Sequence, residues 1–257
     1  MRNIVRFQHP GRHGAAFPPF SPLPPFHGAR SVRALVLSFV CAASAEAARP
    51  MITDDARIVD DKSCQIESWT KRGRDASEAW VLPACNFTGN LELAAGAVHT
   101  RDGAGKGATD LALQGKTLFR PLAPNDWGVG LVAGVVHHPR ADAGGRDWYA
   151  YVPASVSFRD DRFVLHGNLG WLREQEVGAH RLTWGVGSET QVGGGSWLIA
   201  EAFGQNRGRA SYQAGLRHWI VPGRMQVDAT VGDRFGGDDR ERWFSIGLRW
   251  LSLPFLP

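Results

Sequence analysis

The chain has 257 residues, which suits one large β domain or two small ones, and no apolar run approaches the roughly 20 residues that a membrane-spanning helix requires. The formal charge of +4 comes from the first 48 residues, which carry five arginines and one acidic residue. The rest of the chain keeps 24 of the 29 basic and 24 of the 25 acidic residues, so it offers no basic face for nucleic acid.

The beginning of the chain predicts export. Residues 1–29 are rich in proline and are interpreted as disordered, or as an over-extended start. Residues 30–48 contain two arginines, an apolar run of about ten residues and an Ala-x-Ala site, which is the pattern of a cleaved signal peptide. The mature chain is expected to begin near Arg49, with residues 49–61 forming a periplasmic segment.

From residue 62 onward, apolar and polar residues alternate in segments separated by Gly, Pro, Asn and Asp. Most segments reach the roughly 9–11 residues that a tilted strand needs to cross a membrane, whereas soluble strands usually have about five or six. Their even number suits a single-chain antiparallel barrel over residues 62–251, followed by a tail over 252–257. The twelve predicted strands are 62–70, 76–87, 89–100, 108–119, 126–138, 147–158, 161–173, 180–191, 195–205, 210–220, 223–234 and 241–251.

The composition of the two strand faces favours a membrane barrel over a soluble sandwich. In "FVLHGNLGWL" (163–172), Phe163, Leu165, Leu169 and Trp171 share one face and are predicted to face lipid. The last three strands likewise have one apolar face, and charged residues at the centre of the other face, which a dry core could not accept. The ten tryptophans lie toward strand ends, as in the aromatic girdles of outer-membrane barrels, although parity turns some of them inward.

The turns indicate an orientation. With the first strand starting in the periplasm, the tight turns at 158–162, 192–196 and 220–223 fall on the periplasmic side. The longer polar stretches "RDGAGKGA", "PRADAGGRD", "EQEVGA" and "FGGDDRE" then lie outside, which is the usual asymmetry of bacterial barrels. The predicted location is therefore the outer membrane of a Gram-negative bacterium.

Two cysteines remain after the leader, and an oxidising periplasm favours their pairing. A turn between Arg74 and Asp75 sets Cys64 opposite Cys85 and Trp69 opposite Trp80, with the two pairs on opposite faces. The sequence therefore predicts a Cys64–Cys85 disulfide across the first hairpin.

The polar face of the strands predicts a lumen lining. Arg217, Asp228 and Arg249 are expected to form an inward cluster on the last three strands, with Asp228 opposite Gly247 and near Gly215. Such a cluster either sets the charge and width of a pore or braces a sealed barrel, and the sequence leaves both readings open. The full set of predicted lining residues is Glu67, Glu92, Gln213, Arg217, Gln226, Asp228 and Arg249.

The stretch "RPMITDDARIVDDKSCQIESW" (49–69) resembles the mature start of a group of uncharacterised proteobacterial outer-membrane proteins. That group is similar to the transporter family named for the meta-pathway of phenol degradation. The resemblance rests on a Pro-x-x-Thr-Asp-Asp segment followed by a Gln-x-Glu element, and it implies a barrel but no solute. The matching residues here are Pro50, Thr53, Asp54, Asp55, Gln65 and Glu67.

No catalytic, metal-binding or cofactor constellation is predicted. His166 has no serine two positions away, unlike the His and Ser of outer-membrane phospholipase, and His137 and His138 point to opposite faces of a strand. Two functions remain: a pore or transporter for small solutes, or a sealed barrel with a structural or surface-interaction role; an enzyme is the less favoured third. The expected partners are outer-membrane lipids, the barrel-assembly machinery during biogenesis, and an unidentified solute.

Overall fold

The computed structural model describes residues 51–140, 145–236 and 242–257. The expectations for residues 1–29 and 30–48 and for Pro50 lie outside the described residues, as do parts of two expected outer loops. No helix among the described residues is long and apolar enough to cross a membrane.

The fold consists of twelve antiparallel strands, as predicted, and every strand end lies within three residues of its expected position. The strands are β1 (Cys64–Gly73), β2 (Ala76–Asn86), β3 (Leu91–Asp102), β4 (Gly107–Arg120), β5 (Trp127–His137), β6 (Arg146–Phe158), β7 (Phe163–Glu174), β8 (Ala179–Gly193), β9 (Ser196–Gln205), β10 (Ser211–Val221), β11 (Met225–Arg234) and β12 (Trp243–Leu251).

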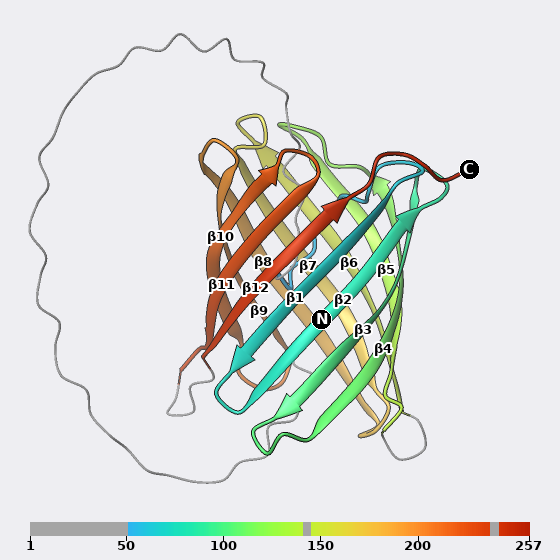
Figure 1. Ribbon diagram of the computed structural model, residues 1–257, viewed down its shortest axis with the longest axis vertical. Coiled ribbons are helices and arrows are strands. Elements are labelled where there is room, and N and C mark those ends of the chain that lie inside the picture. Colours follow the sequence, from blue (N-terminus) through green and yellow to red (C-terminus); the bar gives the residue numbers. More distant parts are fainter. Residues whose placement is uncertain (1–50, 141–144, 237–241) are drawn as a thin grey trace, which may run out of the picture. The chain divides into compact units, whose positions relative to one another are not determined.

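The sheet closes on itself, because β1 pairs with β12 from Gln65↔Leu251 to Gly73↔Trp243. Every other strand pairs with its neighbours in sequence, so the tilted strands in Figure 1 form a barrel without a free edge. Closure satisfies the backbone hydrogen-bonding groups of both terminal strands, which a membrane-embedded sheet requires.

The two faces of the strands differ as the alternation predicted. On β7, Leu165, Leu169 and Trp171 are 40%, 58% and 41% exposed on the outer face, whereas Val164 and His166 are buried inside. The last three strands repeat this division, with large apolar residues outside and Gln, Thr, Ser and charged residues inside. The molecule therefore has the apolar exterior and polar interior of an outer-membrane barrel.

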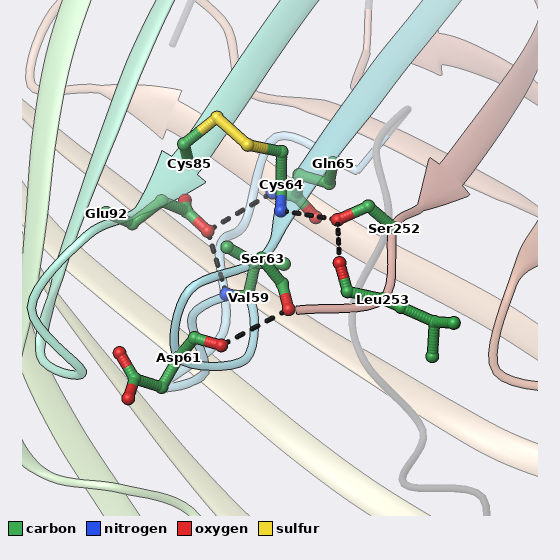
Figure 2. Close-up of a disulfide and its surroundings, with 9 residues drawn as sticks. All are labelled: Val59, Asp61, Ser63, Cys64, Gln65, Cys85, Glu92, Ser252 and Leu253. Carbon is green, nitrogen blue, oxygen red and sulfur yellow. Dashed lines mark hydrogen bonds between the residues drawn. A yellow bond between two sulfur atoms is a disulfide. The ribbon is translucent and has the colours of Figure 1, made fainter. Parts of the chain in front are cut away.

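The first hairpin has the predicted register. Cys64 lies opposite Cys85 and Trp69 opposite Trp80, and the two cysteines form a disulfide with an S–S distance of 2.04 Å (Figure 2). The tryptophan rings stack inside the barrel with their centroids 5.0 Å apart. The disulfide closes a loop 21 residues long, which by chain entropy stabilises the fold by roughly 3 kcal/mol.

The register predicted for the β10–β11 hairpin was wrong by two residues. Asp228 lies directly opposite Arg217, and Gly215 lies opposite Thr230. The two-residue turn expected at Val221–Pro222 is a three-residue turn, followed on the ladder by a bulge, with Gly223 at φ +68°. Three-residue hairpins commonly place glycine in this left-handed conformation, which lengthens the loop and shifts the pairing. The predicted Asp228↔Gly247 pair is confirmed.

Candidate functional site

The interior of the barrel is occupied by the chain's own N-terminal residues. We call residues 51–59 the plug segment; it appears in blue among the strands in Figure 1. The amides of Ile52 and Thr53 donate to the carboxylate of Glu201 on β9, at 2.7 Å each. The amide of Val59 donates to Glu92 on β3 at 2.9 Å. Because these acceptors lie on inner faces far apart in the strand order, the segment crosses the lumen.

This position differs from the expected one. The sequence predicts a periplasmic segment over residues 49–61 and does not predict that it enters the barrel. Within the described part of this range, only Asp60 and Asp61 are exposed. The physical reason is that acidic and amide side chains inside the barrel satisfy the backbone groups of the segment, which therefore needs no strand partner.

Asp54 is held by three strands, two through its side chain and one through its backbone. Its Oδ1 accepts a hydrogen bond from Lys116 Nζ on β4 at 2.9 Å, and its Oδ2 accepts one from the Tyr151 hydroxyl on β6 at 2.7 Å. Lys116 Nζ also lies 3.2 Å from Asp55 Oδ1. On β7, the Asn168 side chain pairs with both backbone groups of Asp54, accepting from its N–H at 2.6 Å and donating to its C=O at 2.9 Å.

A second ionic anchor lies at the turn between β6 and β7. Arg57 donates to Asp161 at 3.1 Å, and both side chains are buried. Asp161 also accepts a hydrogen bond from Ser157. Arg159, Asp160 and Asp161 all have positive φ values, of 54°, 56° and 61°. Because non-glycine residues rarely adopt this conformation, the contacts of Asp161 help to hold an unfavourable turn.

Glycines on β8 make room for the segment. A Cβ at Gly185 would lie 2.6 Å from the Thr53 hydroxyl, and one at Gly187 would lie 2.6 Å from Met51 Cε. Close approach of a second chain to a strand is one of the roles in which glycine is required. Apolar side chains pack the other end of the segment in two clusters: Val59 with Trp197, Trp219 and Leu251, and Ala56 with Leu122 and Val164.

A polar cavity of about 30 Å³ lies between Asp54, Lys116, Glu92, Glu67 and Arg249. This volume holds one or two water molecules. The plug segment and the surrounding barrel side chains thus line a water-sized polar cavity.

The C-terminal tail is hydrogen-bonded to the residues where the chain leaves the plug segment and enters β1. The amide of Ser252 donates to the Cys64 carbonyl, and the amide of Cys64 donates to the Ser252 hydroxyl, each at 2.8 Å. The amides of Phe255 and Leu256 donate to the Lys62 carbonyl. Figure 2 shows the Ser252–Cys64 contact beside the disulfide, together with the bond from Val59 to Glu92. The start of β1, the C-terminal tail and the disulfide thus lie next to one another.

The predicted lining residues all lie buried on the inner face. Some of them contact the plug segment, and others pair with residues of the barrel wall. Glu92 binds the plug segment, whereas Arg217 pairs with Glu189 on β8 at 2.8 Å. Arg249 donates to Gln65 at 2.7 Å and lies 3.7 Å from Glu67. The buried lining residues are Glu67, Glu92, Gln213, Arg217, Gln226, Asp228 and Arg249.

Sequence reasoning missed most of the residues that bind the segment, namely Lys116, Tyr151, Ser155, Asn168 and Glu201. A usable signal existed for two of them. Glu201 is the one charged residue of β9 and lies at an inward position, and Lys116 is an inward ionisable residue in the second half of β4. Nothing in the sequence connected them to Asp54 and Thr53.

A buried Ser–His–Glu array lies beneath the segment. The Ser155 hydroxyl is 2.8 Å from His166 Nδ1, its cross-strand neighbour, and His166 Nε2 is 3.4 Å from Glu189. Hydrolases use such arrays, but here the Ser155 oxygen accepts the hydrogen bond of the Ala56 amide, and all three side chains are buried. The array connects the segment to the Glu189–Arg217 pair.

A separate ionic contact lies near the end of β5 and the start of β6. His138 lies 3.0 Å from Asp110 and 3.1 Å from Asp147. Among the described residues, no group of three or more His, Cys, Asp or Glu side chains has an arrangement suited to a metal ion.

Solved outer-membrane barrels share this fold. The KdgM porin, in a complex with disordered oligogalacturonate, is 11% identical, with a TM-score of 0.54 over 74% of this chain and 99% of that one. The NanC porin gives 11% identity and a TM-score of 0.54 over 74% and 100%. The COG4313 outer membrane channel from Pseudomonas putida F1 gives 12% and 0.50 over 80% and 99%. These identities show a common fold only.

No curated protein matches the sequence significantly. One protein family does match, over residues 35–250, which include the whole plug segment and nearly all of the barrel. The chain belongs to this family, which is described as "Uncharacterised conserved protein UCP029691".

Proposed function

We propose that the protein is an outer-membrane pore or transporter for small solutes, which the plug segment closes in this structure. The observation that carries the proposal is the polar and charged interior of the barrel. The plug segment that lies in this interior is held by side chains of the barrel wall and not by pairing with a strand. The porins and the channel that share the fold support it. The proposal also includes a relationship to the phenol-pathway transporter family, which residues 49–69 suggest. This relationship identifies no solute.

Single-channel recording of the refolded protein in planar bilayers tests this function. The wild type should conduct rarely. Asp54→Asn with Asp55→Asn removes the ionic partners of Lys116 and should raise the open probability without changing the conductance of the open state. Asp60→Asn with Asp61→Asn makes the same charge change at exposed positions and should behave as the wild type. Silence of all three proteins would contradict a pore.

Asp228→Ala probes the lumen itself. Asp228 is buried on the inner face opposite Arg217, so its loss should shift the reversal potential in a salt gradient toward anion selectivity. An unchanged reversal potential, in a variant that conducts, would remove Asp228 from the ion pathway.

The alternative is a sealed barrel with a structural or surface-interaction role. The specific observation in its favour is the narrow cavity beside the segment, about 30 Å³. A sealed barrel predicts that the Asp54 and Asp55 substitutions lower stability without producing any conductance. The same recordings, combined with thermal unfolding, therefore separate the two functions.

A further inference from the structure

The contacts of the plug segment are of two kinds. Glu201, Ser155 and Glu92 accept hydrogen bonds from backbone amides of Thr53, Ala56 and Val59. Such contacts hold any sequence in an extended conformation. Side chains of the segment are also contacted: Arg57 pairs with Asp161, and Asp55 lies 3.2 Å from Lys116. At Asp54 the barrel contacts both the side chain and the backbone, through Lys116, Tyr151 and Asn168.

The groups around Asp54 form a carboxylate site. Lys116 supplies a cation to Oδ1 and Tyr151 supplies a hydroxyl donor to Oδ2, so each carboxylate oxygen receives its own donor. Charge-assisted hydrogen bonds of this kind are the strong ones, and they discriminate against a neutral amide of the same shape. The donors come from β4 and β6, which belong to the barrel wall and not to the segment.

Asn168 extends the site beyond the carboxylate. Its side-chain amide pairs with the N–H and C=O of Asp54 at 2.6 and 2.9 Å, as one amide pairs with another. A ligand that fits all three barrel side chains therefore carries a carboxylate one or two carbon atoms from an amide. Small peptides and N-acylated amino acids with an acidic group have this chemistry.

We propose that Lys116, Tyr151 and Asn168 form a solute-binding site for small amide-bearing carboxylates, and that Asp54 occupies it as an internal competitor. The inference rests on the proposed function and names its solute class. An incoming solute replaces Asp54 in its contacts with Lys116, Tyr151 and Asn168, which hold the middle of the segment. The segment then keeps its remaining backbone contacts and the Arg57–Asp161 ion pair. Solute binding and opening are thereby linked through one lysine.

Binding is measured by calorimetry on the refolded full chain in detergent. The probe is N-acetyl-aspartate methylamide, and the corresponding asparagine derivative is the neutral control. A site that its internal ligand leaves empty in about one molecule in ten binds a probe about tenfold more weakly than a vacant site. The Asp54→Asn, Asp55→Asn protein should therefore bind the aspartate probe at least about tenfold more tightly than the wild type, and the asparagine probe should show no such gain.

Two further variants make the test specific. Adding Lys116→Gln to the Asp54→Asn, Asp55→Asn protein should abolish the gain; this variant leaves no unpaired charge from either partner, so it should fold. Asp60→Asn with Asp61→Asn should bind as the wild type does. Two results would overturn the proposed site. One is equal affinity of the aspartate probe for the wild type and the Asp54→Asn, Asp55→Asn protein. The other is a gain in affinity that persists after Lys116→Gln is added.

The result is independent of the conductance recordings. Tighter binding without conductance would leave the carboxylate site standing in a protein that is not a pore. Conductance without carboxylate binding would leave the pore and remove the site.

Discussion

The outer and inner faces of β7 are formed by alternating residues of one strand, but they place different requirements on those residues. Outside, Leu165 and Leu169 are exposed and have only to be apolar. Inside, Val164 and His166 are buried, and His166 lies against Ser155 and Glu189. The outer face is thus specified by residue class and the inner face by the identity of each partner. Substitutions on the two faces should differ accordingly.

The largest effect is expected at the buried ion pair. Glu189→Gln removes the carboxylate that lies 2.8 Å from the buried Arg217 and should lower the free energy of unfolding by about 3–5 kcal/mol. The measurement is urea unfolding in lipid vesicles, followed by tryptophan fluorescence. Glu174→Gln is the matched control, since its 3.4 Å contact with Arg181 is partly exposed and should contribute about 1 kcal/mol or less. Equal losses would show that inner pairs are no more specific than rim pairs.

An outer-face charge should have the next largest effect. Leu169 is 58% exposed near the middle of β7, where Leu169→Arg should cost about 2–4 kcal/mol in a bilayer. The same substitution at Leu253, in the tail beyond the last strand, should be nearly neutral by the same unfolding assay. A neutral Leu169→Arg would mean that this face does not contact lipid.

Two glycines of β7 compare the faces without any change of charge. A Cβ at Gly170 would lie 2.5 Å from Tyr151 Cβ and 2.7 Å from the Ala150 carbonyl. Gly170→Ala should therefore lower the free energy of unfolding by about 1–3 kcal/mol, because the backbone of β6 must shift. Unchanged stability would indicate that the inner wall can adapt to added volume.

The smallest effect, of opposite sign, is expected at Gly167 on the outer face. A Cβ there meets no described atom within 4 Å, and its φ is not in the left-handed region. Gly167→Ala should raise the free energy of unfolding by about 0.4–1 kcal/mol by restricting the unfolded chain. A loss comparable to that of Gly170→Ala would erase the distinction between the faces.

The same contrast explains what could be predicted from the sequence. Strand ends and the outward residues follow from alternation and turn residues, which are local. The first hairpin was predicted in register because one turn placed two cysteines and two tryptophans opposite each other. The β10–β11 hairpin was not, since its turn contains one more residue than the pattern suggested, and the pairing moved by two.

The plug segment could not be placed from local pattern. Its partners are separated from it by 99 residues at Ser155, 114 at Asn168 and 148 at Glu201. Polar residues at inward positions are compatible with a water-filled lumen or with a bound chain, and alternation does not distinguish these. Thr53, Asp54 and Asp55 were singled out as a motif, but their contacts required the closed barrel.

The hydrogen bonds between the C-terminal tail and the start of β1 have a consequence for the order of folding. The Ser252 hydroxyl accepts from an amide 188 residues earlier in the chain, so this contact forms only when translation and export are complete. Contacts between such distant residues form late, because the intervening chain must first be organised. The start of β1 is therefore secured by the end of the chain, and a chain truncated after Leu251 should close its wall without this last connection.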